Sequence, residues 1–367
     1  MSDVIPAGRL ADAPAQLPVS WYRDPKLFEL ERRLLFENGP GYVGHERMVP
    51  EPGDYHTLAW MDHAKMLVHD ENGVELLSNV CRHRQAIMLE GRGNARNIVC
   101  PLHRWTYDVR GQLMGAPHFP RNPCLHLDKT PLQSWNGMLF AGSRDVVRDL
   151  SVIGSRAELD FGGYLFDSVR IDEYPINWKT FIEVYLEDYH VEPFHPGLGA
   201  FVSCADLRWE FGERHSIQTV GIRDGLGRPG SPVYGRWHEQ VLRYSAGRIP
   251  AHGAIWMLYY PNVMVEWYPN TLVVSTAVPR SPTLTANVVE FYYPEDIVLF
   301  EREYAQAEQA AYLETALEDD VICRRMERGR AALIEQGRSQ AGPYQSPMED
   351  GMQHFHEWLR REVEPYY

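Results

Sequence analysis

The stretch CRHRQAIMLEGRGNARNIVCPLH, from Cys81 to His103, holds two short pairs of metal-binding side chains. A Cys-x-His pair, Cys81 and His83, is followed after sixteen residues by a Cys-x-x-His pair, Cys100 and His103. A [2Fe–2S] centre of the Rieske type needs two thiolates on one iron and two imidazoles on the other. Zinc accepts the same ligands, but zinc-finger spacing usually presents a Cys pair and then a His pair. The spacing therefore favours a [2Fe–2S] cluster over structural zinc.

The chain around these pairs predicts short strands separated by turns. The run HDENGVELLSNVC is a hairpin candidate, because Asn72-Gly73 is a favoured two-residue turn. A second candidate, TYDVRGQLMG, turns near Arg110-Gly111. We expect an all-β domain over residues 39–155, with the two metal-bearing loops at hairpin tips, where a sheet holds them at a fixed separation.

After residue 155 the pattern predicts an α+β domain over residues 156–367, in which long helices grip a sheet. Residues 1–38 are expected to form an N-terminal arm and a helix that pack on this domain. The predicted elements are a helix from Pro25 to Asn38, a strand in FGGYLFDSVRIDEYP, a helix from about Asn177 that ends near Pro193, strands in IWMLYYPNVMVEWY, TLVVSTAVP and LTANVVEFYYP, a broken helical stretch from Pro294 to about Gln336, and a last helix in MEDGMQHFHEWLRREVE.

The helix predicted from Asn177 carries a second set of polar side chains. Glu183, Glu187 and His190 lie at i, i+4 and i+7, which is one stripe of an α-helix, and apolar residues surround them. A buried polar stripe needs partners, and a metal or an ion pair usually supplies them. His195 converges on His190 only if the helix ends or bends between them, where Pro193 lies.

Two His and one carboxylate form the facial triad that binds oxygen-activating non-haem Fe(II). His190 and His195 supply the imidazoles, so the carboxylate comes from elsewhere in the chain. The acidic segment LEDDVICRRMERG offers Asp319 as the first candidate and Asp320 as its rival. The sequence does not separate these neighbours.

The motifs together resemble the catalytic α subunit of a Rieske non-haem iron oxygenase, a ring-hydroxylating-type oxygenase, over nearly the whole chain. CRHR with CPLHRWTYDVRG is similar to the family's cluster motif and its trailing hairpin. NWK followed by Glu187, His190 and His195 is similar to its iron-binding helix. The resemblance implies a Rieske domain plus a helix-grip (START-like) catalytic domain with an antiparallel sheet. It also implies one [2Fe–2S] cluster and one mononuclear Fe(II) per chain, with Asp319 as the third iron ligand.

The resemblance further implies a route for electrons. They originate from NAD(P)H and reach the cluster through a separate ferredoxin and/or flavin reductase. They then pass through His83 or His103 and Glu187 to the iron of a neighbouring subunit, where O2 and a small-molecule substrate react. Because this transfer is intersubunit, the resemblance implies a homotrimer.

Two departures from the family pattern bear on the substrate. Glu rather than Asp at position 187 resembles the carnitine, choline and betaine oxygenase branch, and Val184 stands where many dioxygenases carry an Asn. We therefore expect hydroxylation or oxidative dealkylation of a quaternary or N-methylated amine or of an aromatic acid. The alternatives are an aromatic-ring dihydroxylating dioxygenase and, from another class, a Rieske electron carrier or ligand-binding protein that lacks the mononuclear iron.

Arginines cluster in and beside the two metal-bearing loops, at Arg82, Arg84, Arg92 and Arg104. They can pair locally with acids or loop carbonyls. We hypothesise that some form a basic docking rim for an acidic ferredoxin or reductase domain.

Composition limits the partners and the compartment. The formal charge of −14 argues against nucleic acid or an anionic membrane surface as the main partner. No apolar run of eighteen residues predicts a membrane span, and the N-terminus does not have the pattern of a secretory signal. Beyond the two cluster cysteines, Cys124, Cys204 and Cys323 are expected to be buried free thiols, which indicates a reducing cytoplasm.

Overall fold

The computed structural model describes residues 15–153 and 156–367. The first fourteen residues of the expected N-terminal arm lie outside the described residues. The chain forms two compact units: a smaller one, Asn38–Arg148, and a larger one that combines Met1–Glu37 with Asp149–Tyr367.

The smaller unit is built from short antiparallel strands, as the sequence predicts. Both predicted hairpins are confirmed: β3 and β4 are joined by Glu71-Asn72, one residue before the predicted Asn72-Gly73 turn, and β7 and β8 are joined by the turn around Arg110-Gly111. The strands form three sheets, in the orders β5-β2-β3-β4-β9, β6-β7-β8 and β1-β11-β10. Their bounds are β1 Tyr42–His45, β2 Asp54–Thr57, β3 Lys65–Asp70, β4 Gly73–Ser78, β5 Arg92–Asn94, β6 Asn97–Val99, β7 Thr106–Asp108, β8 Leu113–Gly115, β9 Lys129–Thr130, β10 Gln133–Trp135 and β11 Met138–Phe140.

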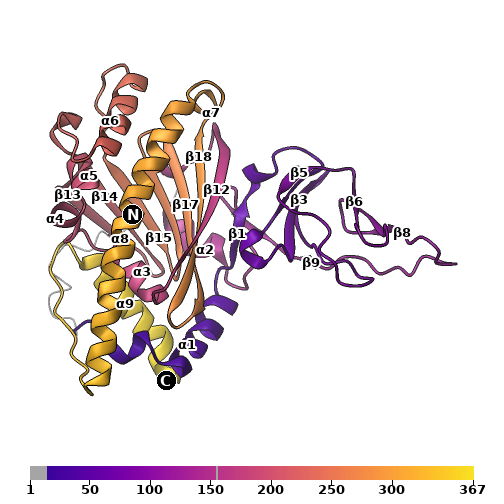
Figure 1. Cartoon of the computed structure of the whole chain (residues 1–367), viewed down its shortest axis with the longest axis horizontal. Coiled ribbons are helices and arrows are strands. Elements are labelled where there is room, and N and C mark those ends of the chain that lie inside the picture. The colour runs from indigo at the N-terminus through magenta and orange to yellow at the C-terminus, as the bar shows by residue number, and fades with distance from the viewer. Residues whose placement is uncertain (1–14, 154–155) are drawn as a thin grey trace. The chain divides into compact units, whose positions relative to one another are not determined.

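The larger unit is organised around one seven-stranded antiparallel sheet, in the order β12-β18-β17-β16-β15-β14-β13 (Figure 1). Its strands are rich in Val, Ile, Tyr and Trp, which suit a pleated, buried surface. The central strands β15 and β16 are buried along almost their whole length. The bounds are β12 Tyr164–Tyr174, β13 Val202–Phe211, β14 His215–Ile222, β15 Ala254–Tyr259, β16 Val263–Tyr268, β17 Thr271–Ser281 and β18 Leu284–Pro294.

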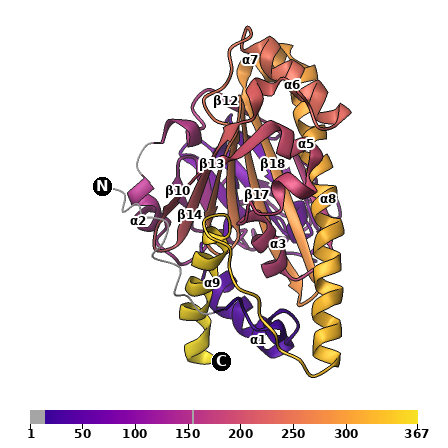
Figure 2. The same ribbon diagram turned by 90° about the vertical axis from the view of Figure 1, so that its left-hand side faces the viewer.

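Helices pack along this sheet, and the longest is α8, which runs beside it in both views (Figures 1 and 2). The predicted break in the stretch from Pro294 falls at Glu301, between α7 and α8. The described residues contain no helix long and apolar enough to cross a membrane. The α-helices are α1 Pro25–Glu31, α2 Val146–Leu150, α3 Trp178–Tyr185, α4 Val191–Phe194, α5 Pro196–Phe201, α6 Pro232–Tyr244, α7 Glu295–Phe300, α8 Arg302–Glu335 and α9 Asp350–Val363.

The helix predicted from Asn177 begins as expected but ends early. The Asn177 side chain accepts a hydrogen bond from the backbone N–H of Lys179 at 2.9 Å and so caps α3. The helix stops at Tyr185 because the next backbone groups pair with the first turn of α9 and the segment before it. The Leu186 carbonyl accepts from Met352 N–H at 3.1 Å, and Asp188 N–H donates to the Met348 carbonyl at 3.0 Å. The predicted helical stripe of Glu183, Glu187 and His190 is therefore wrong.

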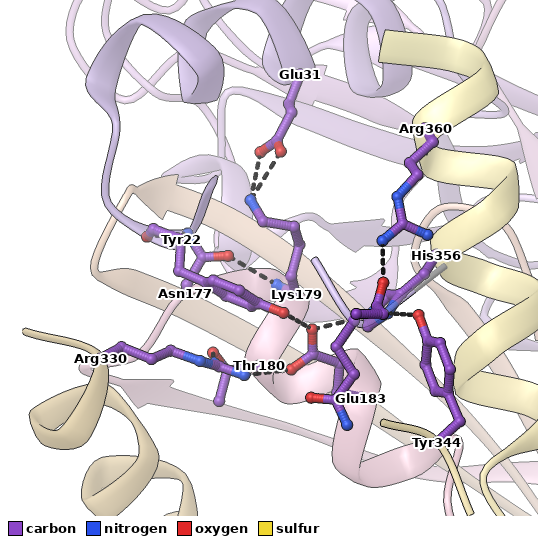
Figure 3. Close-up of polar contacts among 12 residues, drawn as sticks. Tyr22, Glu31, Asn177, Lys179, Thr180, Glu183, Arg330, Tyr344, His356 and Arg360 are labelled. Carbon is purple, nitrogen blue, oxygen red and sulfur yellow. Dashed lines mark hydrogen bonds and ion pairs between the residues drawn. The ribbon is translucent and has the colours of Figure 1, made fainter. Parts of the chain in front are cut away.

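Glu183 belongs to a buried polar network that includes Tyr22, Arg330 and His356 (Figure 3). Its carboxylate accepts hydrogen bonds from the hydroxyl of Tyr22 and, at 2.7 Å, from the guanidinium of Arg330, and it lies 3.0 Å from His356 Nε2. Burial disfavours its charge, but Arg330 and His356 outweigh that effect and hold the pKa of Glu183 at about 2. The network ties the N-terminal segment, α3, α8 and α9 together, so Glu183 is a structural residue.

Candidate active site

The four predicted cluster ligands lie on two loops of closely similar backbone geometry. Cys81 N–H donates to the Ala86 carbonyl at 2.9 Å, and Cys100 N–H donates to the Trp105 carbonyl at 2.8 Å. Each loop contains one residue in the left-handed region, Gln85 at φ 55° and Arg104 at φ 60°. Such tight turns aim neighbouring side chains at one point.

The loops bring the two cysteines into the core of the smaller unit and the two histidine rings together. Cys81 and Cys100 are each 1% exposed, and the Tyr107 hydroxyl lies 3.7 Å from Cys81 Sγ. The ring centres of His83 and His103 are 4.7 Å apart. His83 Nδ1 is buried and has no hydrogen-bond partner among the described residues. Two buried thiols and a close imidazole pair fit the ligand set of a Rieske cluster.

The ring of His83 has a fixed orientation. It stacks on Trp105, with centres 4.9 Å apart and planes 4° apart, and it meets Phe119 edge-on. Cys124, by contrast, is exposed, so its prediction as a buried thiol is wrong; Cys204 and Cys323 are buried.

The larger unit brings His190, His195 and Asp319 together, with one ligand atom from each within 4.8 Å of the others. His195 Nε2 lies 3.1 Å from Asp319 Oδ1, and His190 Nε2 lies 3.5 Å from the same oxygen. Because α3 ends early, both histidines sit on the irregular segment around α4 and face Asp319 on α8. His195 Nε2 and Asp319 Oδ1 are buried, and although they lie 3.1 Å apart, no described residue gives either atom a well-aligned hydrogen bond. These unpaired atoms fit a bound cation.

The outer nitrogen of each histidine faces another acid. His195 Nδ1 lies 2.7 Å from Glu318 Oε2, and His190 Nδ1 lies 2.5 Å from Glu187 Oε1. Metal-binding histidines usually contact a carboxylate in this way, which fixes the ring and leaves the other nitrogen for the metal. Glu187 therefore contacts His190 directly within its own chain.

The electrostatics of the site formed by His190, His195 and Asp319 favour a positive charge. Burial opposes the imidazolium of His190, but Asp319 and Glu187 outweigh it and raise the pKa of His190 to about 10. Burial likewise opposes ionisation of Asp319, yet the two histidines lower the pKa of its carboxyl. A metal ion would replace these protons in satisfying the acids.

Asp320, the rival of Asp319, points to a different partner. Both of its carboxylate oxygens accept from Arg324 Nε at 2.8 Å, one turn further along α8. The structure thus brings Asp319, and not Asp320, to the two histidines.

His190, His195 and Asp319 line a cavity of the larger unit, and the sequence did not predict the walls of this cavity. Among its described lining residues six are acidic and none is Lys or Arg: Glu187, Asp188, Glu266, Glu308, Asp319 and Asp320. Aromatic side chains form much of the remaining wall: Tyr174, Phe181, Tyr185, Tyr234, Trp237, Trp256, Tyr268 and Tyr312. Glu266 was detectable as the one acid within the apolar strand VMVEWY, but Glu308 is one of many acids in its helix.

The comparisons with known proteins agree with this geometry. The family model "Ring hydroxylating alpha subunit (catalytic domain)" matches residues 154–364, and the "Rieske [2Fe-2S] domain" model matches residues 40–135. The chain is 64% identical to putrescine 2-hydroxylase from Ralstonia nicotianae, covering 98% of this chain and 99% of the relative. It is 53% identical to putrescine 2-hydroxylase from Bordetella bronchiseptica, covering 98% and 87%.

More distant matches lie in the branch that the sequence indicated. Chloroplastic choline monooxygenase from Beta vulgaris is 28% identical, with 95% of this chain and 77% of the relative covered. The solved structure of the quaternary ammonium Rieske monooxygenase CntA with L-carnitine has a TM-score of 0.76 at 18% identity and covers 98% of this chain and 99% of that one, so the fold is shared.

The Rieske domain and the catalytic domain of this family carry a [2Fe–2S] cluster and a mononuclear iron, and the residues described above fit both. The family needs an electron-transfer partner and a small-molecule substrate. The chain belongs to the ring-hydroxylating α subunits, the catalytic subunits of Rieske non-haem iron oxygenases.

Proposed function

We propose that this protein is the terminal oxygenase of a diamine hydroxylase and that it hydroxylates putrescine at carbon 2. The observation that carries the proposal is the charge of the cavity, in which six carboxyl groups and no Lys or Arg line the described wall beside His190 and His195. A cavity of one sign recruits and holds a ligand of the opposite sign. The 64% identity to a putrescine 2-hydroxylase supports the same substrate.

The wall chemistry favours a primary diamine over the other candidate substrates. A primary ammonium donates charge-assisted hydrogen bonds to carboxylates, whereas a quaternary ammonium has no N–H to donate. An aromatic acid would bring a further negative charge into an acidic cavity. A neutral arene would leave the buried acids without a partner.

We infer that His190, His195 and Asp319 hold the mononuclear iron, while Cys81, Cys100 and the two cluster histidines hold the [2Fe–2S] centre. The iron, when bound, supplies the activation of O2. The chain's own residues bind the amine, orient it beside the histidines and keep bulk water away. Glu187, which contacts His190, is proposed as the bridge that receives electrons from the cluster of a neighbouring subunit.

The first test is a substrate screen with the loaded enzyme and a reconstituted reductase. Putrescine should cause coupled consumption of NADH and O2 and give a product heavier by one oxygen atom, which 18O2 labels. 1,4-Butanediol, of the same length but uncharged, should cause at most about a tenth of that rate, since it loses its charged hydrogen bonds. Faster coupled turnover of choline, glycine betaine or an aromatic acid would contradict the proposal.

We further propose that a separate ferredoxin and/or flavin reductase supplies the electrons. We also propose that the protein works as a homotrimer, as the resemblance to the family implies, since transfer from each subunit to the next closes in a ring. None of the five cysteines forms a disulfide, which supports a cytoplasmic location.

Docking of the electron donor can be tested at the cluster loops. Arg82 is paired with Asp128 at 2.9 Å, so we assign the docking role to Arg84 and Arg104, which are exposed beside His83 and His103. Charge reversal of both (Arg84→Glu, Arg104→Glu) should slow reduction of the cluster by about 10-fold or more at low salt, and the salt dependence should weaken. Stopped-flow reduction by the ferredoxin or reductase measures both effects.

The double variant Arg228→Glu, Arg236→Glu is the matched control, because it makes the same charge change at two exposed positions of the larger unit. Equal reduction rates and equal salt slopes for the loop variant and the unaltered protein would refute the docking role.

A further inference from the structure

Two fully buried carboxyl groups line the cavity without any cation beside them. Glu266, on β16, is 3% exposed, and Glu308, on α8, is 1% exposed. Neither forms an ion pair with a described residue. Buried acids in proteins are usually paired with a cation, so two unpaired acids in one cavity indicate that a ligand supplies the positive charge.

Neutral donors hold both carboxyl groups in place. The Tyr268 hydroxyl donates to Glu266 Oε2 at 2.8 Å, and the Tyr312 hydroxyl donates to Oε1 at 3.0 Å. Tyr293 donates in the same way to Glu308 Oε2 at 2.5 Å. Phenol hydroxyls orient a carboxylate and leave its charge unneutralised, because they are themselves neutral. These hydrogen bonds therefore preorganise the two carboxyl groups for a ligand.

The positions along α8 give the cavity two ends. Glu308, Tyr312 and Asp319 lie on one face of the helix, at i, i+4 and i+11. With a rise of about 1.5 Å per residue, Tyr312 lies about 10 Å and Glu308 about 16 Å along the axis from Asp319. Glu266 accepts a hydrogen bond from the Tyr312 hydroxyl, and it interacts electrostatically with Asp319 on one side and Glu308 on the other, so it lies between the histidine end and Glu308.

The side-chain alternation along β16 also shows that Glu266 faces the cavity. Met264, Glu266 and Tyr268 alternate along β16, and all three line the cavity wall. Trp256 on β15 donates from Nε1 to the Tyr268 hydroxyl at 2.9 Å, which extends the network across the sheet. Aromatic faces beside a buried carboxylate favour an organic cation over a hydrated metal ion.

We propose that Glu266, with Glu308 beyond it, forms the ammonium-binding end of the cavity. There Glu266 holds the substrate amine that lies farther from the carbon to be oxidised. The inference rests on the proposed function and names the residue that selects a diamine. An ammonium on Glu266 directs the rest of the chain towards His190 and His195. The second amine then lies among the acids at that end.

The electrostatics of the two carboxyl groups agree with this geometry. Burial raises the pKa of Glu266 to about 7, with a smaller contribution from Asp319. Burial also raises the pKa of Glu308 to about 8, and Glu266 and Asp167 add to it. A bound ammonium favours both carboxylates, so binding near pH 7 should release protons. Calorimetry in buffers of different ionisation enthalpy measures that release.

The decisive experiment compares Glu266→Gln with Glu290→Gln in the holoenzyme. Glu290 is a matched control, since it is 3% exposed and accepts from Tyr292 at 2.7 Å, but it does not line the cavity. Glu266→Gln should weaken putrescine binding about 10- to 100-fold, the value of a charged hydrogen bond, while Glu290→Gln binds within about 3-fold of the unaltered protein. Proton release should fall in Glu266→Gln and in Glu308→Gln.

The outcomes separate this inference from the proposed function. If the unaltered enzyme neither binds nor oxidises putrescine, the proposed function fails. If it does both and Glu266→Gln, with unchanged circular dichroism and iron content, binds putrescine equally well, the anchor is elsewhere and the inference is overturned. Should Glu266→Gln fold poorly, the unaltered enzyme still decides: binding of 1,4-butanediol as tight as that of putrescine would refute an ammonium anchor.

Discussion

Replacing Asp319 by alanine (Asp319→Ala) should remove the mononuclear iron and leave the cluster in place. Asp319 Oδ1 lies 3.1 Å from His195 Nε2 and 3.5 Å from His190 Nε2, so its loss leaves only two imidazoles for the metal. Metal analysis should fall from three irons per chain to two. Turnover should drop at least about 1,000-fold, because the metal's contribution of several kcal/mol to catalysis is lost with it. The visible spectrum of the cluster should not change.

Asp320→Ala is the matched control for this experiment. The two acids are neighbours on α8, but Asp320 is bonded to Arg324 rather than to a histidine. We expect Asp320→Ala to keep three irons and most of its activity. A loss of iron in Asp320→Ala together with full iron in Asp319→Ala would reverse the assignment made from the geometry.

The cluster loops are the part of the protein that the sequence predicts most completely. Cys81 and His83 are two residues apart, and Cys100 and His103 are three apart, so local backbone turns alone bring each pair together. The hairpins that turn at Glu71-Asn72 and around Arg110-Gly111 are predictable to within one residue for the same reason, since turn chemistry depends on adjacent residues. Such local features require no knowledge of the tertiary structure.

The iron-binding segment shows where local reasoning fails. Periodicity placed Glu183 on the same stripe as His190, yet α3 ends at Tyr185 because the backbone of Leu186 and Asp188 pairs with residues more than 150 positions later. Tertiary hydrogen bonds override helix periodicity there. Glu183 consequently bonds to Tyr22 and Arg330 instead.

The sequence does not predict which acids line the cavity, for a related reason. Glu266 and Glu308 come from a strand and a helix that meet only in the folded unit, through the hydrogen bond from Tyr312. Nothing in the helix sequence distinguishes Glu308, which is buried, from Glu303, which is exposed. Charge selectivity of the cavity thus follows from which acids the fold buries, and only the structure gives that.

Replacing Glu187 by glutamine (Glu187→Gln) should nearly abolish coupled turnover while iron content and cluster spectrum persist. The Glu187 carboxylate lies 2.5 Å from His190 Nδ1 and accepts from the His190 backbone N–H at 3.0 Å. Glutamine keeps the shape but loses the charge that the bridge requires. Loss of a partner of a metal-bound histidine costs about 10- to 100-fold in activity, and we expect at least about 100-fold here because electron delivery fails as well.

A pre-reduced enzyme separates a bridge from a merely positioning residue. When it is mixed with O2 and putrescine, the cluster of the unaltered protein should be reoxidised within the first turnover, whereas the cluster of Glu187→Gln should stay reduced. Glu192→Gln is the control, because Glu192 follows on the same segment but pairs with Arg223 at the surface. Rapid cluster reoxidation in Glu187→Gln would place the electron route elsewhere. Slow cluster reoxidation at saturating putrescine, with normal iron content, would leave the carboxylate beside His190 as the point where the cluster's electrons enter the oxidation of the amine.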